Sequence, residues 1–463
     1  MKHIHFIGIG GTGLSAIARV LLEKGFSISG SDREASSLFN AISAAGAVTF
    51  VGHAAEHIEG ADLVIRSSAI PNDNPEILAA HKKGIPVIKR ADFLQELTAE
   101  KETVAIAGSH GKTTTTAMLV WIFDQLGLDP SYIVGGIVNQ LGTNAHAGLG
   151  SAFIIEADEY DNMFLGLSPK MAVITNIEYD HPDFFPTEES YLSAFVNFLA
   201  RVQPGGIAFY CLDDLITRSL LTNSALTNLH FLSYGISSDA NYRAAQVEIR
   251  KGFPKFTLQY RKVKDQIEDL GSLSLKISGH HNILNAIAAL AVVHQWGLPI
   301  NEAMQVLSQF TGVNRRFEVL DTVKGITIID DYGHHPSQLN TTLKAARARY
   351  PGCRLWAVWQ PHTYSRTMAL EEAYIQSLNL ADKVLVLKIY SAREENPGYS
   401  AEVIAQALPQ EKARYFSSFD SAIQHLLKYL KAEDVLIIFS AGDATYISQA
   451  IGKSLKQGSE AAK

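Results

Sequence analysis

A glycine loop near residue 110 carries the residue types that bind nucleoside triphosphates. The segment AGSHGKTTTT spans residues 107–116, between an apolar run and a helical pattern. Gly108 and Gly111 let successive backbone N–H groups point at phosphate oxygens. Lys112 supplies positive charge for the β- and γ-phosphates, and the Thr113 hydroxyl suits Mg²⁺. We therefore predict an ATP loop, whose other members are Ser109, His110 and Thr114.

A second glycine pattern lies near the start of the chain. Gly8, Gly10 and Gly13 form G-x-G-x-x-G directly after an apolar run, with Gly11 between them. Such a loop lets the backbone approach a diphosphate at the N-terminus of the following helix. Asp32 follows Gly13 by about 20 residues, where dinucleotide-binding folds place a ribose-binding acid. Taken alone, this pattern favours an NAD-dependent dehydrogenase. The diphosphate of a UDP-sugar suits the same loop, and the glycines could also serve helix–strand packing alone.

Acidic side chains follow two later apolar runs. Glu156 begins EADEYD at residues 156–161, and His181 ends TNIEYDH at residues 175–181. Ligands of open α/β sheets bind at the carboxyl ends of the strands. Glu156 offers a hard oxygen ligand for Mg²⁺, whereas His181 is a less usual magnesium ligand. The pattern predicts a metal site, with solvated strand ends as the alternative. Three further acidic residues are candidates to hold the metal ligands in place: Asp158, Glu159 and Asp180.

Basic and histidine-containing loops mark the C-terminal third of the chain. They are RRF at residues 315–317, DDYGHHP at 330–336 and QPHTYSRT at 360–367. An Arg side chain can grip a carboxylate or a phosphate with two parallel hydrogen bonds. We therefore predict a binding site for an anionic substrate here, with a surface charge cluster as the alternative.

Apolar runs of strand length alternate with helix-sized segments along most of the chain. Examples lie at residues 4–9, 103–108, 171–178, 355–360 and 434–442. This order is typical of parallel sheets covered by helices on both faces, so we predict the α/β class. Residues 229–278 alternate more like antiparallel strands, which predicts a small extra sheet.

Two polar stretches divide the chain into three parts. LTAEKE at residues 97–102 precedes the strand of the ATP loop, and TGVNRRF at 311–317 precedes another β-rich start. A length of 463 residues also suits about three domains. We predict domains at residues 1–100, 101–312 and 313–463.

Composition excludes several classes of protein. The chain is 47% hydrophobic and 19% charged, which is an ordinary globular balance. A net charge of −7 without a basic stretch argues against a nucleic-acid binder. Cys211 and Cys353 are too few for a disulfide framework or a four-thiolate metal site. The chain has neither a signal-peptide pattern nor a long apolar run, so we expect a cytoplasmic protein without membrane association.

The ATP loop departs from the usual phosphate-loop pattern, because Ile106 stands where that pattern has its first glycine. The shortened G-x-x-G-K-T-T form resembles the ATP loop of the Mur ligase and folylpolyglutamate synthetase superfamily. GHHNILNAIAA at residues 279–289 resembles the family segment G-x-H-N-x-x-N-A-x-A-A. Together with EADEYD, DDYGHHP and QPHTYSRT, the resemblance to the Mur ligases covers essentially the whole chain in three ordered blocks.

The resemblance implies the three-domain Mur ligase architecture. This comprises a Rossmann-like N-terminal domain that binds a UDP-sugar, a central P-loop ATPase-type domain with the small extra sheet, and a Rossmann-like C-terminal domain that binds an amino acid. It also implies ATP-driven ligation of the amino acid to a carboxylate of the UDP-sugar through an acyl phosphate, with ATP and Mg²⁺ as cofactors.

Two segments refine the expected substrates. DDYGHHP and QPHTYSRT are most similar to family members that join L-alanine to UDP-N-acetylmuramate in peptidoglycan precursor synthesis. The alternative within the family is murein peptide ligase, which adds L-Ala-γ-D-Glu-meso-diaminopimelate to the same UDP-sugar. A dehydrogenase would leave the ATP loop unused. Neither the residues nor the resemblance indicates an obligate protein partner.

The resemblance also implies a role for each matching residue. The family's catalytic residues match Lys112, Glu156, His181, Arg316, Asp331 and His334, and its magnesium ligands match Thr113, Glu156 and His181. Beyond the loop, the ATP site gains His281, Asn282 and Asn285, and the two Asn side chains share one helix face suited to an adenine edge. The UDP-sugar site matches Gly8, Gly10, Gly11, Gly13, Ser31, Asp32, Ser68 and Ala69. The amino-acid site matches Tyr332, His334, His362 and Arg366, with Arg393 as a weaker candidate.

Overall fold

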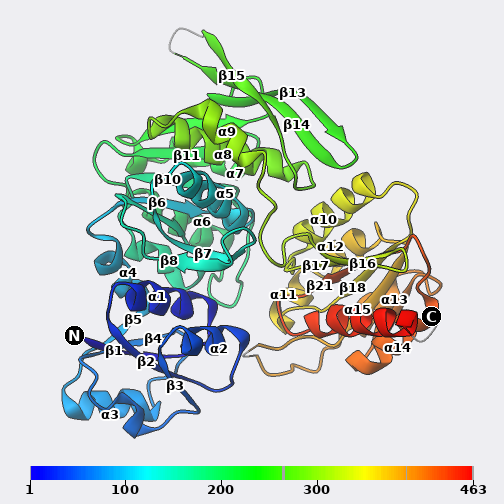
Figure 1. The fold of residues 1–463 in the computed structure, drawn as a ribbon, viewed down its shortest axis with the longest axis horizontal. Helices are drawn as coiled ribbons and strands as arrows, with labels where there is room; N and C mark the ends of the chain where they lie inside the picture. Colours follow the sequence, from blue (N-terminus) through cyan, green and yellow to red (C-terminus); the bar gives the residue numbers. More distant parts are fainter. Residues whose placement is uncertain (1, 263–265, 393, 461–463) are drawn as a thin grey trace.

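The computed structural model describes residues 2–262, 266–392 and 394–460, so Arg393 lies outside the described residues. Three sheets follow one another along the chain, each with helices packed on it (Figure 1). Among the described residues, every helix is too short or too polar to span a bilayer.

The N-terminal domain is a parallel sheet in the order β3-β2-β1-β4-β5. Its strands are β1 (His3–Ile7), β2 (Ser27–Asp32), β3 (Val48–Val51), β4 (Leu63–Arg66) and β5 (Val87–Lys89). Its helices are α1 (Thr12–Glu23), α2 (Ser37–Ala44), α3 (Pro75–Lys83) and α4 (Arg90–Thr98). The strand order reverses between β1 and β4, and the first glycine loop follows β1 at this switch point, where open α/β sheets bind ligands.

The central domain is built on a mixed sheet in the order β15-β14-β13-β12-β11-β10-β6-β9-β7-β8. Its strands are β6 (Glu102–Ala107), β7 (Ser131–Val138), β8 (Thr143–His146), β9 (Ala152–Glu156), β10 (Met171–Ile174), β11 (Ile207–Cys211), β12 (His230–Gly235), β13 (Tyr242–Arg250), β14 (Phe253–Arg261) and β15 (Ile267–Ser274). Its helices are α5 (Lys112–Gln125), α6 (Glu188–Leu199), α7 (Leu215–Ser219), α8 (His281–Gln295) and α9 (Ile300–Leu307). Helices α5 and α8 pack together in the core and are buried along most of their length.

The antiparallel strands expected near residues 229–278 are present as β13, β14 and β15. The prediction of a separate small sheet is wrong, because Tyr242 and Arg243 of β13 pair with Tyr234 and Gly235 at the end of β12, so the three strands extend the central sheet. This pairing gives backbone partners to the β12 edge only at Tyr234 and Gly235.

The C-terminal domain has the sheet order β16-β17-β21-β18-β19-β20. Its strands are β16 (Glu318–Val323), β17 (Ile326–Asp331), β18 (Leu355–Trp359), β19 (Lys383–Leu387), β20 (Ala413–Phe416) and β21 (Val435–Phe439). Its helices are α10 (Pro336–Arg349), α11 (Tyr364–Ala369), α12 (Glu371–Leu378), α13 (Glu402–Ala407), α14 (Phe419–Tyr429) and α15 (Thr445–Glu460). All pairs are parallel except that of the edge strand β16 with β17.

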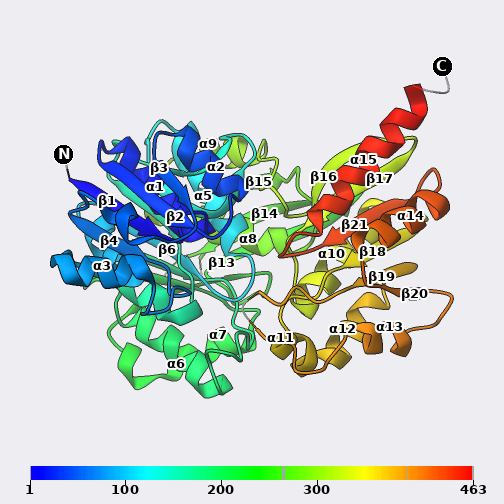
Figure 2. The same ribbon diagram turned by 90° about the horizontal axis from the view of Figure 1, so that it is seen from below.

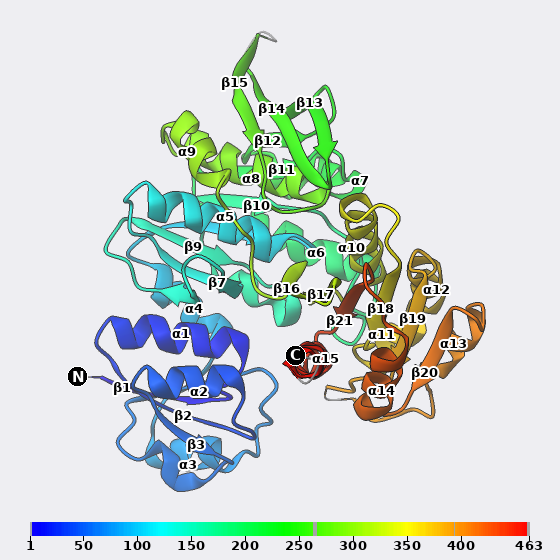
Figure 3. The same cartoon turned by 45° about the vertical axis from the view of Figure 1, so that its right-hand side comes forward.

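The three domains bring their strand ends toward shared boundaries. Helix α1 of the N-terminal domain packs on β7 and β8 of the central domain. In Figure 2 the C-terminal domain lies beside the other two, with α15 projecting away from the central domain. Figure 3 shows α10, which follows β17, beside the central domain. The loops after β6 and β17 therefore meet between the central and C-terminal domains.

Candidate active site

The ATP loop predicted at residues 107–116, called the phosphate loop below, joins the buried strand β6 to helix α5. It needs glycine at two positions. Gly108 has φ +126° and Gly111 has φ +82°, a region that side chains other than glycine rarely adopt. A Cβ atom at Gly108 would lie 2.1 Å from the Thr175 hydroxyl oxygen, and one at Gly111 would lie 2.6 Å from Asn285 Oδ1. Helix α5 has no side-chain cap, so its first N–H groups face the loop. These groups form an anion site.

Lys112 lies beneath this loop with a carboxylate partner. Its ammonium group donates to Glu159 Oε2 at 2.7 Å and to Glu159 Oε1 at 3.0 Å. Burial lowers the pKa of Lys112, but Glu159 and nearby acidic groups more than offset this effect, so the pKa is raised. Lys112 therefore carries its positive charge at the loop, held by Glu159.

Glu156 and Thr113 meet at the other side of the loop. The Thr113 hydroxyl donates to Glu156 Oε1 at 3.0 Å, and the Gly135 N–H donates to Glu156 Oε2 at 2.6 Å. Burial raises the pKa of Glu156, while Lys112 and Arg316 act in the opposite direction. A hydroxyl and a carboxylate are the hard oxygen donors that Mg²⁺ prefers, so this pair fits the ion.

His181 lies apart from that pair. Its Nε2 atom is 3.8 Å from Glu159 Oε1 and 3.8 Å from Asp180 Oδ2, and its Nδ1 atom is 3.5 Å from Arg366 Nη2. The backbone at His181 has φ +57°, which turns the chain sharply after β10. The structure thus brings Thr113 and Glu156 together and gives His181 a different set of neighbours.

The two Arg residues of RRF point in different directions. Arg316 Nη2 donates to the Thr113 hydroxyl at 3.2 Å, whereas Arg315 Nη2 donates to the Ser440 carbonyl at 2.6 Å. Asp331 holds this segment, because its carboxylate accepts from the N–H groups of Phe317 at 2.9 Å and Gly333 at 2.7 Å. Asp331 therefore sets how Arg316 reaches the phosphate loop.

A cavity of about 620 Å³ opens between the phosphate loop, α8 and the C-terminal domain. His281 lines it, and burial lowers the pKa of this His to about 4. The His281 Nδ1 atom has no hydrogen-bond partner among the described residues. Asn282 Nδ2 donates to the Ser278 carbonyl at 2.7 Å, and Asn285 Nδ2 donates to Asn282 Oδ1 at 2.9 Å. Both Asn amides are engaged within the protein, so their contact with adenine stays a prediction.

The predicted amino-acid residues gather around Arg366, which is buried. Arg366 Nε donates to Asp180 Oδ1 at 2.8 Å, and its Nη1 atom lies 3.1 Å from His362 Nδ1. The rings of His334 and His362 are 5.7 Å apart, and the Tyr332 and His334 rings are 5.8 Å apart. Burial alone would raise the pKa of Asp180, but Arg366 and neighbouring His residues hold it well below its ordinary value. Burial and Arg366 likewise hold the pKa of His334 well below its ordinary value.

The first glycine loop is bonded largely to its own domain. The N–H groups of Gly8 and Ile9 donate to the Ser31 carbonyl, at 2.8 Å and 3.0 Å. The Gly10 N–H donates to Asp32 Oδ2 at 2.8 Å, so the Asp32 carboxylate supports the loop. Gly11 N–H donates to the Gly8 carbonyl at 3.2 Å.

Ser31 contacts the first glycine loop through its backbone carbonyl. Its side chain is fully buried, and its hydroxyl donates to Glu76 Oε2 at 2.7 Å. This hydroxyl is engaged within the protein, so direct contact of Ser31 with a UDP-sugar stays a prediction. Ser68 and Ala69 lie in the loop after β4, and the neighbouring Ser67 is 3.2 Å from a Cβ atom built on Gly8.

Sequence reasoning missed Arg90 and Gly135. A Cβ atom built on Gly13 would lie 1.5 Å from Arg90 Nη1, so this guanidinium lies against the first glycine loop. Arg90 Nη2 is also 3.3 Å from Asp158 Oδ2 in the central domain. The signal for Arg90 was its place directly after an apolar strand. The signal for Gly135 was a glycine pair inside a strand, which marks close approach of another group.

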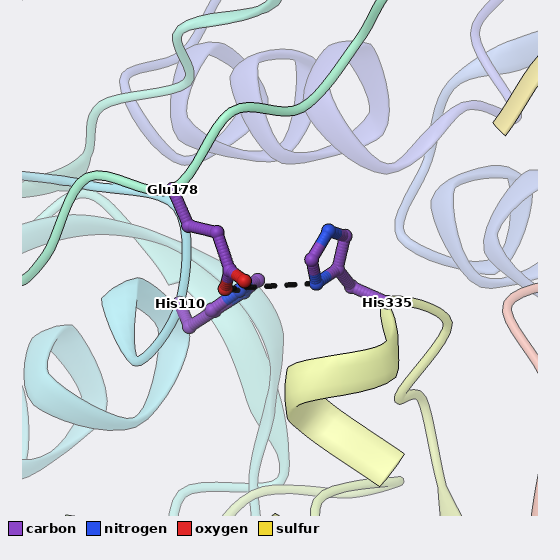
Figure 4. Close-up of side chains that lie close together, drawn as sticks. All are labelled: His110, Glu178 and His335. Atoms are coloured by element: carbon purple, nitrogen blue, oxygen red, sulfur yellow. Dashed lines mark hydrogen bonds and ion pairs between the residues drawn. The ribbon is translucent and has the colours of Figure 1, made fainter. Parts of the chain in front are cut away.

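One group of three His and carboxylate side chains lies close enough to share a metal ion, among the residues that the structure describes. It is His110, Glu178 and His335, at the boundary of the central and C-terminal domains (Figure 4). None of the three was predicted as a magnesium ligand.

Comparison with known proteins gives a consistent result. Three family models match in chain order: the Mur ligase family catalytic domain at residues 3–102, the Mur ligase middle domain at 106–293 and the Mur ligase glutamate ligase domain at 315–442. The UDP-N-acetylmuramate–L-alanine ligase of Geobacter sp. (strain M21) is 39% identical over 464 residues, covering 99% of both chains. That of Sorangium cellulosum (strain So ce56) is 40% identical and covers 96% of this chain and 94% of its own.

Solved structures agree over the whole chain. The UDP-N-acetylmuramate–alanine ligase of Thermotoga maritima has a TM-score of 0.84 at 27% identity, covering 99% of this chain and 100% of its own. The murein peptide ligase of Psychrobacter arcticus 273-4 has a TM-score of 0.74 at 25% identity, covering 98% and 99%. With its three domains, its shortened phosphate loop and relatives matched along their full length, the chain belongs to the Mur ligase family.

Proposed function

We propose that the protein joins L-alanine to the lactyl carboxylate of UDP-N-acetylmuramate, with conversion of ATP to ADP and phosphate, in peptidoglycan precursor synthesis. The full-length relatives with this name, at 39–40% identity, support the substrates. One observation carries the chemistry: Arg316 of the C-terminal domain reaches Thr113 of the phosphate loop. This contact joins the C-terminal domain to the central domain, which carries the ATP loop. The C-terminal domain carries the Arg366 cluster, defined as Tyr332, His334, His362 and Arg366.

We assign phosphoryl transfer to the phosphate loop. An ionised carboxylate is a poor electrophile, so its oxygen first attacks the γ-phosphorus of ATP, ADP leaves, and an acyl phosphate forms. Lys112 directly precedes Thr113, and Arg316 donates to the Thr113 hydroxyl, so both cations stabilise the charge that develops on the transferring group. Thr113 and Glu156 would hold Mg²⁺, which would supply further neutralisation of the phosphate oxygens.

We assign amine attack to the Arg366 cluster. The amino acid arrives as an ammonium ion and must lose a proton before its nitrogen can attack the acyl carbon. His334 is the proposed acceptor, because its Nδ1 atom lies 3.2 Å from the Tyr332 carbonyl oxygen and donates to it, which leaves Nε2 as the unprotonated nitrogen of the neutral ring. Arg366 grips the amino-acid carboxylate, which takes the place of its Asp180 contact. The nitrogen–carbon bond forms, the bond from the acyl carbon to the phosphate oxygen breaks, and phosphate leaves.

The two alternatives have weaker support. An NAD-dependent dehydrogenase has no use for the phosphate loop, and three ligase family models span the chain. For the tripeptide ligase, the similarity is lower: 25% identity and a TM-score of 0.74, against 27% and 0.84 for the alanine ligase structure. The cytoplasmic location and the absence of an obligate protein partner stay predictions.

The test is phosphate release from ATP with Mg²⁺ and UDP-N-acetylmuramate. Parallel reactions contain L-alanine, L-Ala-γ-D-Glu-meso-diaminopimelate or no acceptor. We expect release that depends on L-alanine. Release with the tripeptide alone would make the protein the recycling ligase, and oxidation of a substrate with NAD would overturn the ligase assignment.

A further inference from the structure

His110, Glu178 and His335 lie beside the phosphate loop, where the central and C-terminal domains meet (Figure 4). His110 Nε2 is 2.7 Å from Glu178 Oε2, and His335 Nδ1 is 3.6 Å from the same oxygen. Ser337 of α10 donates its hydroxyl hydrogen to Glu178 Oε1 at 2.5 Å. Two imidazoles and a carboxylate are a common zinc ligand set. The cluster is therefore either a metal site or a hydrogen-bond network that needs no metal.

Gln338 distinguishes a metal site from a hydrogen-bond network. Its Oε1 atom accepts from the backbone N–H groups of His334 at 2.8 Å and His335 at 3.1 Å. The opposite end of the amide is therefore the nitrogen, and it lies 3.0 Å from His110 Nδ1. An amide nitrogen only donates, so His110 Nδ1 accepts, and the ring proton must reside on Nε2.

This tautomer favours the network. With its proton on Nε2, His110 donates to Glu178 and has no lone pair on that atom for a metal ion. A flip of the Gln338 amide would free His110 Nδ1 as a donor, but it would remove the acceptor for both backbone N–H groups. Both ring nitrogens of His110 are thus bonded without a metal, whereas the buried His335 Nε2 has no hydrogen-bond partner among the described residues.

The network joins the two sites of the proposed reaction. On one side, the Ser109 hydroxyl donates to the Glu178 carbonyl at 2.8 Å and accepts from the Glu178 N–H at 2.8 Å, so Glu178 is fixed to the phosphate loop. On the other side, Gln338 holds the backbone of His334, whose ring lies in the Arg366 cluster.

We propose that Gln338, through His110 and Glu178, positions the loop between β17 and α10, which carries His334, against the phosphate loop. The amine then attacks the acyl phosphate before water does. This inference rests on the proposed function. Gln338 and Glu178 are positioning residues, since they act through the phosphate loop and His334. When the network is broken, water attacks the acyl carbon, the bond to the phosphate oxygen breaks, and the original carboxylate and free phosphate are regenerated.

The test compares phosphate released with ligated product formed. The wild-type protein should give one phosphate per product. Gln338→Ala should release more phosphate than product and raise the KM for L-alanine about tenfold, as expected for the loss of one or two hydrogen bonds, with the KM for ATP within about twofold. Lys344→Ala is the matched control, because this exposed residue lies on the same helix.

Two His110 variants separate the network from a metal site. An amide offers both an acceptor and a donor, so His110→Gln should keep a phosphate-to-product ratio near one, whatever its effect on the KM for ATP, whereas His110→Ala should raise this ratio as Gln338→Ala does. Equal ratios and KM values in wild type, Gln338→Ala and His110→Ala would overturn the proposal. A second combined result would also overturn it. In that result His110→Gln has the same raised phosphate-to-product ratio as His110→Ala, and the protein shows a visible Co²⁺ absorption band that requires His110, Glu178 and His335.

A measurement without turnover keeps this inference separate from the proposed function. In ¹⁵N-histidine-labelled full-length protein, His110, identified by its loss in His110→Gln, should show a protonated Nε2 and an unprotonated Nδ1. The opposite tautomer would overturn the network even if ligation is observed. Absence of L-alanine-dependent phosphate release in the wild type would instead defeat the proposed function.

Discussion

At the scale of single residues, the proposed phosphoryl transfer depends most directly on the largely buried Lys112. Its ammonium group lies between the phosphate loop and Glu159. Lys112→Ala should lower the rate of phosphate release by about 100-fold or more, since one preorganised donor to developing charge has about this effect. The measurement is the initial rate of L-alanine-dependent phosphate release.

Loss of Lys112 also leaves the buried Glu159 without its cation, which costs about 3 kcal/mol of unfolding free energy. The matched control is Lys112→Met combined with Glu159→Gln, which removes both charges. This double variant should recover stability and stay inactive. Near-normal turnover in either variant would contradict the assigned role.

Asp330 gives a prediction on pH. Burial raises the pKa of this side chain to about 7. The folded protein therefore binds this proton more tightly than the unfolded chain, so the stabilisation is largest in acid and is lost as the pH rises through 7. Asp330→Asn cannot ionise, and its advantage in unfolding free energy over the wild type should grow between pH 5 and pH 8 by up to roughly 3 kcal/mol. Urea denaturation at both pH values measures this difference, and a constant difference would contradict the raised pKa.

The sequence supports a predicted role for a residue only where the residue type itself carries the chemistry. The Lys-Thr pair and the glycines of the ATP loop predict a phosphate-binding site. The sequence could not indicate that Arg316 reaches Thr113 while Arg315 turns into its own domain, because that depends on a positive φ at Arg315 and on the Asp331 contacts. Nor could it show that Ser31 is buried behind its loop.

At the scale of elements, the turn from β6 into α5 shapes the phosphate loop. Gly111→Ala should weaken ATP binding, because a Cβ atom there meets Asn285 Oδ1 at 2.6 Å and the backbone has φ +82°. Gly127→Ala is the matched control, since its φ is +77° and nothing lies within 4 Å of its Cβ position. Both variants should lose about 1 kcal/mol of unfolding free energy from backbone strain. Only Gly111→Ala should raise the KM for ATP, and an equal rise in both would contradict the crowding argument.

The α/β class was predictable at this scale, because parallel strands buried on both faces require continuous apolar runs. The three-domain Mur ligase architecture expected from the motifs is confirmed. The joining of β13 to β12 was not predictable, because it depends on which sheet edge lies within reach. The boundaries at residues 100 and 313 stay predictions.

At the scale of the whole molecule, Arg366 links the C-terminal domain to the central domain through Asp180. Arg366→Ala should raise the KM for L-alanine by about tenfold or more, with a smaller change in the KM for ATP, because it removes the proposed carboxylate grip. Arg366→Lys keeps the charge without the paired hydrogen bonds, so its KM for L-alanine should lie between those of the wild type and Arg366→Ala. Steady-state kinetics with each substrate varied in turn decide this, and an unchanged KM for L-alanine would remove Arg366 from the amino-acid site.

The same variant tests the domain boundary. Without Arg366, the buried Asp180 loses the cation that lowers its pKa. The stabilisation from this carboxylate is present at neutral pH and is lost as the pH falls through its depressed pKa. The stability gap between wild type and Arg366→Ala should therefore be large at pH 7 and shrink toward pH 3. A gap that does not change with pH would contradict the ion pair.

The most direct test of the central claim follows one oxygen atom. UDP-N-acetylmuramate labelled with ¹⁸O at both oxygens of its lactyl carboxylate is incubated with ATP, Mg²⁺ and L-alanine, and the masses of both products are measured by mass spectrometry. The account predicts UDP-N-acetylmuramoyl-L-alanine and an equal amount of phosphate that carries one ¹⁸O, because the carboxylate oxygen passes to phosphorus in the acyl phosphate. Unlabelled phosphate, or phosphate without the alanyl product, would contradict it.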